Sequence, residues 1–265
     1  MAVVTGAAGG IGRGLAGGLI DRSCRVALVD VDARKLGETA RDLRAKGGVV
    51  SEHEVDVADR CAMAELPQEV VDTHGAVHLL FNNAGVSAAS PFERSDLDDF
   101  EWVMGVNFWG VVYGCRYFLP HLSDGGHIVN ILSDFALLGF PTKTAYCASK
   151  FGVRGFGEAL QSELHGQQIS VTNVYPGPVD TGLIRSGRHW DPRKQEEEAR
   201  FVASRALSLP RVVRRILAAV ERDRARVRIG KETLAIDLMK RFFPSLTDSL
   251  LSRFRHRVPF ASEGE

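Results

Sequence analysis

The chain reads AVVTGAAGGIG at residues 2–12, and this stretch decides the fold. A short run of strand-forming apolar residues comes first, and an apolar-periodic stretch through Leu15, Leu19 and Ile20 follows the glycines. This order predicts a strand, a glycine turn and a helix. Glycines let the backbone turn tightly and approach a pyrophosphate, and the N–H groups and dipole of the new helix attract that anion. The stretch therefore predicts a dinucleotide site.

A carboxylate ends the second predicted strand, which reads RVALVD at residues 25–30. Asp30 lies 18 residues past Gly12 (30 − 12 = 18), close to the roughly 20 expected of an acid that binds the adenosine ribose. Such an acid accepts hydrogen bonds from both ribose hydroxyls and repels a 2′-phosphate. No Lys or Arg occupies residues 5–12 and Val31 follows the acid, so the sequence favours NAD over NADP.

Two polar residues, Tyr146 and Lys150, stand four positions apart in TAYCASK at residues 144–150. On a helix they share one face. A tyrosine hydroxyl, which ordinarily titrates near pH ~10, is an acid or base at neutral pH only if its phenolate is stabilised, and an ammonium one turn away does that. A surface pair has the same spacing, so the pair needs the other motifs to indicate chemistry.

Five motifs in order make the chain resemble the short-chain dehydrogenase/reductase family, from the glycine turn to roughly residue 230. The resemblance implies a single-domain α/β fold with a doubly wound parallel sheet of the Rossmann type. The motifs are the cofactor loop Thr5-Gly-x-x-x-Gly-Ile-Gly12, the adenine contact Asp56-Val57, the turn Asn82-Asn-Ala-Gly85, the catalytic pair Tyr146-x-x-x-Lys150 and the nicotinamide-side turn Tyr175-Pro-Gly177.

The resemblance also implies the roles of individual residues in reversible hydride transfer between the nicotinamide and a secondary alcohol or ketone. Tyr146 exchanges the hydroxyl proton, and Lys150 lowers the pKa of that tyrosine and binds the nicotinamide ribose. Ser133 holds the substrate oxygen, and Asn107 anchors a water that links the lysine to solvent. The implied cofactor-binding residues are Thr5, Gly6, Gly10, Ile11, Gly12, Asp30, Asp56, Val57, Asn83, Ala84, Gly85, Tyr146, Lys150, Pro176, Gly177, Val179 and Thr181.

Several of these residues also have a purely structural interpretation. Ser133 closes an apolar run, where a serine can simply begin a turn. Asn107 sits in an apolar helical stretch, where it indicates either a kink stabilised by a bound water or a hydrogen-bonded core asparagine. Asp56 can be the N-cap of a helix that begins near Ala58. The turn at residues 82–85 can be structural only.

Strand and helix patterns alternate along the chain, which predicts a parallel sheet covered on both faces. Residues 1–230 are expected to form the dinucleotide-binding catalytic domain, with a substrate lid at about residues 182–207. Residues 231–265 are expected to form a C-terminal basic amphipathic helical extension. The strands are expected near residues 2–5, 25–30, 49–55, 77–81, 126–132, 169–175 and 226–229.

The substrate pocket is implied, by the resemblance, to be lined by FALLGF at residues 135–140, which is almost wholly apolar. A lipid-, steroid- or retinoid-like alcohol therefore fits better than a sugar. Asp134 departs from the small residue usual beside the catalytic serine, and it either faces solvent or adds a charge to the site. The alternative functions are an NADP-dependent carbonyl reductase of a polar substrate and a non-catalytic dinucleotide-binding sensor or scaffold.

Composition agrees with one enzyme domain of 265 residues that are 45% hydrophobic. The 33 basic residues balance 33 acidic ones, which disfavours nucleic-acid binding. Four cysteines without paired spacing and scattered histidines predict neither a disulfide framework nor a metal site. Cys147 is expected in the core. Because no apolar run has transmembrane length and no cationic leader precedes the first strand, we expect a cytoplasmic protein.

Residues 205–257, which include most of the C-terminal extension, are basic, with 14 Lys/Arg against 5 Asp/Glu. Leu246, Leu250 and Phe254 recur every fourth residue after Pro244, which predicts an amphipathic helix. We expect its apolar stripe to dock on the fold itself or on a partner subunit. Peripheral membrane contact and an anionic-substrate site are alternatives that we do not favour. By resemblance, we expect a homodimer or homotetramer packed through the helix that bears the catalytic tyrosine.

Overall fold

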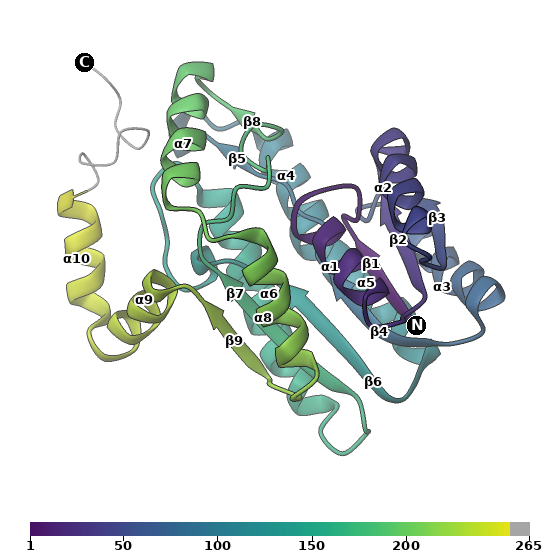
Figure 1. Ribbon diagram of the computed structural model, residues 1–265. Coiled ribbons are helices and arrows are strands. Elements are labelled where there is room, and N and C mark those ends of the chain that lie inside the picture. Colours follow the sequence, from purple (N-terminus) through teal and green to yellow (C-terminus); the bar gives the residue numbers. More distant parts are fainter. Residues whose placement is uncertain (255–265) are drawn as a thin grey trace.

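A computed structural model describes residues 1–254, which form a three-layered α/β fold (Figure 1). Residues 255–265 lie outside the described residues, so the end of the predicted basic extension is not placed. No helix in the described part is long and apolar enough to cross a membrane.

The central sheet has seven parallel strands in the order β3-β2-β1-β4-β6-β7-β9. The expected strands are all present, although β6 begins earlier than predicted and its register shifts against β4. From β1 the strand order runs outward to β3 on one side, and from β4 it runs outward to β9 on the other. The point between β1 and β4 is where a doubly wound sheet has its ligand crevice. The strands are β1 (Ala2–Thr5), β2 (Val26–Asp30), β3 (Val50–Glu54), β4 (Val77–Asn82), β6 (Leu122–Ile131), β7 (Ser170–Pro176) and β9 (Arg226–Ile229).

Helices cover both faces of the sheet, as the alternating pattern predicted. One apolar cluster joins the sheet to α1 (Gly10–Ile20), α2 (Ala33–Ala45) and α8 (Leu209–Val220). The other joins it to α3 (Arg60–His74), α5 (Gly110–Phe118) and α6 (Thr144–Glu163). In Figure 1, α8 lies in front of the sheet and α6 behind it. Three short elements precede α5, namely η1 (Phe92–Arg94), α4 (Leu97–Met104) and η2 (Gly105–Trp109). Two more lie between α5 and α6, namely η3 (Leu119–His121) and η4 (Asp134–Ala136).

A ladder of asparagines fixes α6 on the sheet. Asn82 donates to Asn130 over 2.9 Å, and Asn130 donates to Asn173 over 3.2 Å, across three neighbouring strands. Gly157 of α6 lies so close to this ladder that a Cβ there would collide with the amide of Asn173. This close approach brings the N-terminal turns of α6 to the carboxyl ends of β6 and β7.

The expected lid contains structure that the sequence pattern did not predict. A two-residue strand β8 (Arg188–His189) pairs with β5 (Ala88–Ala89), and helix α7 (Pro192–Arg205) follows it. Among the residues of α7, only Glu198 and Ala199 are buried. Residues 182–207 are therefore held mainly by β8 and by a few side chains.

The described part of the C-terminal extension forms two helices, α9 (Lys231–Phe242) and α10 (Pro244–Phe254). Both lie at the β9 end of the molecule in Figure 1. Phe242, Phe243 and Leu246 are 67%, 60% and 54% exposed. These three side chains do not dock on their own fold, so the predicted docking would require a partner subunit.

Candidate active site

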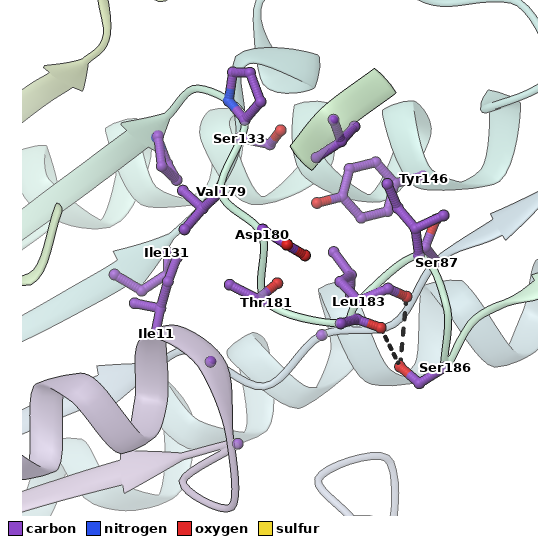
Figure 2. Close-up of a pocket in the computed structure, with 18 of the residues that line it drawn as sticks. Ile11, Ser87, Ile131, Ser133, Tyr146, Val179, Asp180, Thr181, Leu183 and Ser186 are labelled. Atoms are coloured by element: carbon purple, nitrogen blue, oxygen red, sulfur yellow. Dashed lines mark hydrogen bonds between the residues drawn. The ribbon is translucent and has the colours of Figure 1, made fainter. Parts of the chain in front are cut away.

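A cavity of about 690 Å³ crosses the carboxyl end of the sheet, from the glycine turn to the lid. Figure 2 shows Ile11 and Thr181 toward one part of it and Ser133 and Tyr146 toward another, with the tyrosine hydroxyl directed inward. Predicted site residues that line it are Gly6, Gly10, Ile11, Asp30, Asn83, Ala84, Gly85, Ser133, Tyr146, Lys150, Pro176, Gly177, Val179 and Thr181.

The glycine turn has the backbone geometry that an anion requires. Gly6 and Gly10 have φ of +64° and +51°, which side chains rarely adopt. A Cβ on Gly12 would collide with the carbonyl oxygen of Gly6, so only glycine allows α1 to start this close to the turn. Gly9 caps α1 without a side-chain hydrogen bond, and the first turn holds no acid. The first N–H groups of α1 are thus available to a pyrophosphate, and these residues fit a dinucleotide.

Asp30 lies at the end of β2 and lines the same cavity. Its two carboxylate oxygens accept the N–H groups of Ala8 at 2.9 Å and Asp32 at 3.0 Å. A carboxylate has about four acceptor positions, so two remain for ribose hydroxyls. Lys35 also lines the cavity, and its ammonium lies 2.7 Å from the carboxylate of Asp32. The sequence reading missed this lysine because it considered only the residues next to Asp30.

Thr5 braces the glycine turn against the turn at residues 82–85 and does not line the cavity. Its hydroxyl oxygen accepts the N–H groups of Asn83 and Ala84, each at 3.0 Å. The side-chain amide of Asn83 donates to the carbonyl oxygens of Thr5 at 2.8 Å and Gly6 at 3.2 Å. These bonds fix the two loops in one arrangement at the switch point of the sheet.

Tyr146 and Lys150 occupy successive turns of α6, and both are buried. The ammonium of Lys150 lies 5.7 Å from the centroid of the tyrosine ring and donates to the carbonyl oxygen of Ile131 over 3.1 Å. Burial lowers the pKa of Lys150 to about 8. Burial also raises the pKa of Tyr146, although a hydrogen bond with Ser133 opposes this. The net shift is upward because desolvation of the phenolate outweighs the hydrogen bond with Ser133.

Ser133 follows β6 and begins the short helix η4. Its hydroxyl donates to Oδ1 of Asp134 over 2.8 Å and accepts the N–H of Phe135 over 3.2 Å. Asp134 is half-buried and lines the cavity, so it adds a charge to the site instead of facing bulk solvent. Burial raises the pKa of Asp134 to about 6.

Asn107 lies in the π-helical turn η2, an irregularity of the helix that is compatible with both interpretations of the sequence. Its side chain is fully buried and pairs with the backbone of Val86, accepting the N–H at 2.8 Å and donating to the carbonyl at 2.9 Å. It also donates to Ser149 over 3.2 Å. The side chain is thus a hydrogen-bonded core amide. A Cβ on Gly85 would lie 3.3 Å from its Oδ1 and 3.7 Å from Nζ of Lys150, so these two polar atoms flank the same glycine.

Two expected adenine-side residues lie outside the lining of the cavity. Asp56 is exposed and accepts the N–H of Ala58 at 2.9 Å, whereas Val57 is buried. The proposed capping role of Asp56 is wrong, because α3 begins at Arg60 with Asp59 as its N-cap. Cys147 is buried beside Tyr146, as expected of a core residue.

A buried polar group in the cavity wall was missed by the sequence reading. The ammonium of Lys143 lies 2.8 Å from Oε1 of Glu198 and donates to the hydroxyl of Ser87 over 3.2 Å. His189 lies 3.8 Å from the other oxygen of Glu198. Lys143 is three residues before Tyr146, a helical spacing that could have drawn attention to it.

Comparison with known proteins gives consistent matches. Residues 1–192 match the family model described as short chain dehydrogenase. A Mycobacterium tuberculosis protein named "Putative oxidoreductase SadH" is 40% identical, over 95% of this chain and 94% of that protein. D-threitol dehydrogenase of Mycolicibacterium smegmatis is 30% identical, over 79% of this chain and 81% of that enzyme.

Solved structures agree with these matches. A short chain dehydrogenase/reductase from Burkholderia phymatum, in complex with NAD, is 30% identical and superposes with a TM-score of 0.84. That match covers 93% of this chain and 94% of the other. Among the similar structures, one contains NAD and another NADP, so the likeness supports a nicotinamide dinucleotide without selecting between the two.

Proposed function

Because this chain belongs to the short-chain dehydrogenase family and is an oxidoreductase, we propose that it is an NAD-dependent dehydrogenase of a bulky, apolar secondary alcohol or ketone. The observation that carries the proposal is one cavity that contains both the glycine turn with Asp30 and the hydroxyls of Ser133 and Tyr146. A dinucleotide bound at the glycine turn and Asp30 would direct its nicotinamide ring toward the hydroxyls of Ser133 and Tyr146, as the chemistry of this family requires.

The chain's own residues supply binding and proton transfer. The bound nicotinamide would take up hydride from the alcohol or give it to the ketone. The Oη of Tyr146 then exchanges the proton of the substrate oxygen, and Ser133 hydrogen-bonds that oxygen. Since burial raises the pKa of Tyr146, its neutral hydroxyl suits proton donation to a ketone oxygen. In the oxidation direction, the ammonium of Lys150 is the cation placed to stabilise the phenolate.

Preference for NAD is supported by Asp30. Its remaining acceptor positions suit the two ribose hydroxyls, and its charge would repel a 2′-phosphate. Lys35 is the cation that would favour NADP, but its ammonium is paired with Asp32, which offsets that charge. The balance of these groups supports NAD.

A bulky apolar substrate is supported by the wall of the cavity near Tyr146. The ring of Tyr146 stands edge-on to Phe135, with ring centroids 6.0 Å apart, and Phe135 stacks on Phe140. Leu183 and Phe201 add to this wall from the lid segment. Aromatic and aliphatic side chains of this kind bind an apolar body through desolvation.

A polar polyol is the second candidate substrate. Ser87, Lys143 and Glu198 line the cavity, and a relative is named D-threitol dehydrogenase. Against this candidate, the charges of Lys143 and Glu198 are paired with each other, so they neutralise one another.

A screen of alcohols with each cofactor tests the proposal. The purified protein is incubated with NAD or NADP and with aliphatic, aromatic, steroid, retinoid and sugar alcohols including D-threitol, and formation of reduced cofactor is measured. We expect turnover with NAD and the lowest KM for an apolar secondary alcohol. Lys150→Ala should weaken both turnover and NADH binding. A preference for NADP or for D-threitol contradicts the proposal, and NADH binding without turnover of any alcohol supports a sensor or scaffold instead.

Self-association is a further part of the proposal, carried over from the family resemblance. It is supported by an aromatic surface next to the catalytic helix. Trp109 is 47% exposed and stacks on Tyr113 at 5.7 Å, and Phe151 of α6 is 39% exposed. Exposed aromatic side chains of this kind are typical of interfaces. Sedimentation velocity should give a dimer or tetramer, and a monomer at micromolar concentration contradicts this.

A further inference from the structure

The hydroxyl of Ser133 has a fixed set of hydrogen-bond partners within the chain. A serine hydroxyl has one proton and two lone pairs. The proton is donated to Oδ1 of Asp134, and one lone pair accepts the N–H of Phe135. The second lone pair is left for the hydroxyl of Tyr146 or for a substrate, and no proton is left for either. In this arrangement, Ser133 can accept a hydrogen bond from a substrate oxygen but cannot donate one to it.

The reaction requires a donor at this position, if the proposed function is correct. Negative charge develops on the substrate oxygen during hydride transfer, and a preorganised donor stabilises that charge. A hydrogen bond to a carboxylate is roughly twice as strong as one between neutral groups. Asp134 as a carboxylate thus competes with the substrate oxygen for the proton of Ser133.

The surroundings of Asp134 offer the carboxylate little stabilisation. Tyr146 and Cys147 face it from α6, and Glu232 acts on it from α9. Within residues 1–254, no ion pair of Asp134 is present. Burial, with a smaller contribution from Glu232, raises its pKa to about 6, while the hydrogen bond from Ser133 opposes the rise.

We propose that Asp134 is a positioning residue that decides which hydrogen bond Ser133 makes. As a carboxylate, Asp134 accepts the hydrogen bond of the Ser133 hydroxyl, so that proton is not available to the substrate oxygen. As a carboxylic acid, having taken one proton from solvent, it donates its own O–H to Oγ of Ser133 and frees the serine proton for the substrate oxygen. Figure 2 shows Ser133 and Tyr146 on the same side of the cavity, so a freed proton can reach an oxygen that Tyr146 also contacts.

Asp134→Asn tests this proposal because the amide N–H can donate to Ser133 as the protonated acid does. The measurement is kcat/KM for an alcohol that the wild type oxidises, from about pH 5 to about pH 9. The result is the ratio of variant to wild type at each pH. Because the Asp134 carboxylate also raises the pKa of Tyr146, the same ratio is measured in a Ser133→Ala background, where only the effect on Tyr146 remains. With Ser133 present, we expect the ratio to rise from about one at acidic pH to roughly ten above pH 7, with NADH binding unchanged.

Glu232→Gln is the matched control because it removes a carboxylate from the same cavity without a contact to Ser133. Removing Glu232 can only favour the Asp134 carboxylate, so its ratio to wild type should not exceed one at any pH. An Asp134→Asn enzyme that is slower than wild type at every pH, or whose ratio is independent of pH, overturns the proposal.

A second measurement does not depend on turnover. Infrared difference spectra of wild type against Asp134→Asn isolate the titration of the Asp134 carboxyl. In Ser133→Ala that titration should move to higher pH, because the carboxylate loses its hydroxyl donor. An unchanged titration overturns the proposal. Lack of turnover by the wild type with a normal infrared result would instead contradict the proposed function alone.

Discussion

The ammonium nitrogen of Lys143 lies 2.8 Å from Oε1 of Glu198, and both side chains are almost fully buried. The pair joins the residue that precedes α6 to the middle of the lid helix α7. Because α7 buries only Glu198 and Ala199, this ion pair is a main attachment of the lid over the cavity.

Glu198→Ala should destabilise the protein strongly, because it leaves the charge of Lys143 buried and unpaired. Breaking a buried pair costs about 3–5 kcal/mol, whereas replacing both partners with apolar residues of similar size costs much less. We therefore expect the double change Lys143→Met with Glu198→Leu to be more stable than Glu198→Ala in urea unfolding. If the effects of Lys143→Met and Glu198→Leu on the free energy of unfolding add up to that of the double change, the two residues are not coupled.

Asp30→Ala should lower the use of NAD and raise that of NADP. The change removes acceptors for two ribose hydroxyls and the repulsion of a 2′-phosphate, which is worth roughly tenfold to a hundredfold in kcat/KM. A further Val31→Arg should extend the switch. Asp42→Ala, a surface change outside the cavity, is the control. Preference for NADPH in the wild type means that our interpretation of Asp30 is incorrect.

Acid should destabilise the protein through His189. Burial, with Lys143 contributing, lowers the pKa of His189 to about 4 from its ordinary 6.5. The unfolded chain therefore binds a proton at a pH where the folded chain does not. The stability from neutral His189 is complete above pH 6.5 and is lost as the pH falls toward 4.

His189→Gln should accordingly reduce the loss of stability between neutral and acidic pH. Chemical denaturation at several pH values measures this, with His165→Gln at an exposed position as the control. Equal acid sensitivity in the wild type and His189→Gln argues that another group is responsible.

Deleting residues 241–265 should lower solubility or subunit number more than it changes binding to liposomes. Phe242, Phe243 and Leu246 are exposed in the single chain, and docking on a partner subunit would cover them. Sedimentation velocity and liposome co-sedimentation measure the two effects. Binding of the intact protein to anionic liposomes that is weakened by salt and lost on deletion would favour a membrane surface instead.

The sheet was predictable because its signals are local. Most strands contain a short apolar run followed by turn residues, and the glycine turn before α1 identifies the first unit. The helix irregularity at Asn107 was also visible, since an amide between glycines interrupts an apolar helix. Helix ends are less certain, because Asp56 and Asp59 can each cap, and the structure selects Asp59.

The features that the sequence did not predict depend on contacts between residues that are distant along the chain. Lys143 and Glu198 are 55 positions apart (198 − 143 = 55), and nothing in either local sequence indicates the other. Strand β8 is two residues long and exists because it pairs with β5. The orientation of Asp134 depends on the serine beside it and on the burial that α6 and α9 impose, so the sequence left both possibilities open.

Turnover by Tyr146→Phe tests the central claim most directly. The change removes one hydroxyl from a buried ring with little change in shape. We predict that oxidation of an alcohol used by the wild type with NAD is abolished, while NADH binding, followed by fluorescence, stays within a few-fold of wild type. Retained turnover in Tyr146→Phe would contradict the account, because proton exchange would then not depend on this hydroxyl.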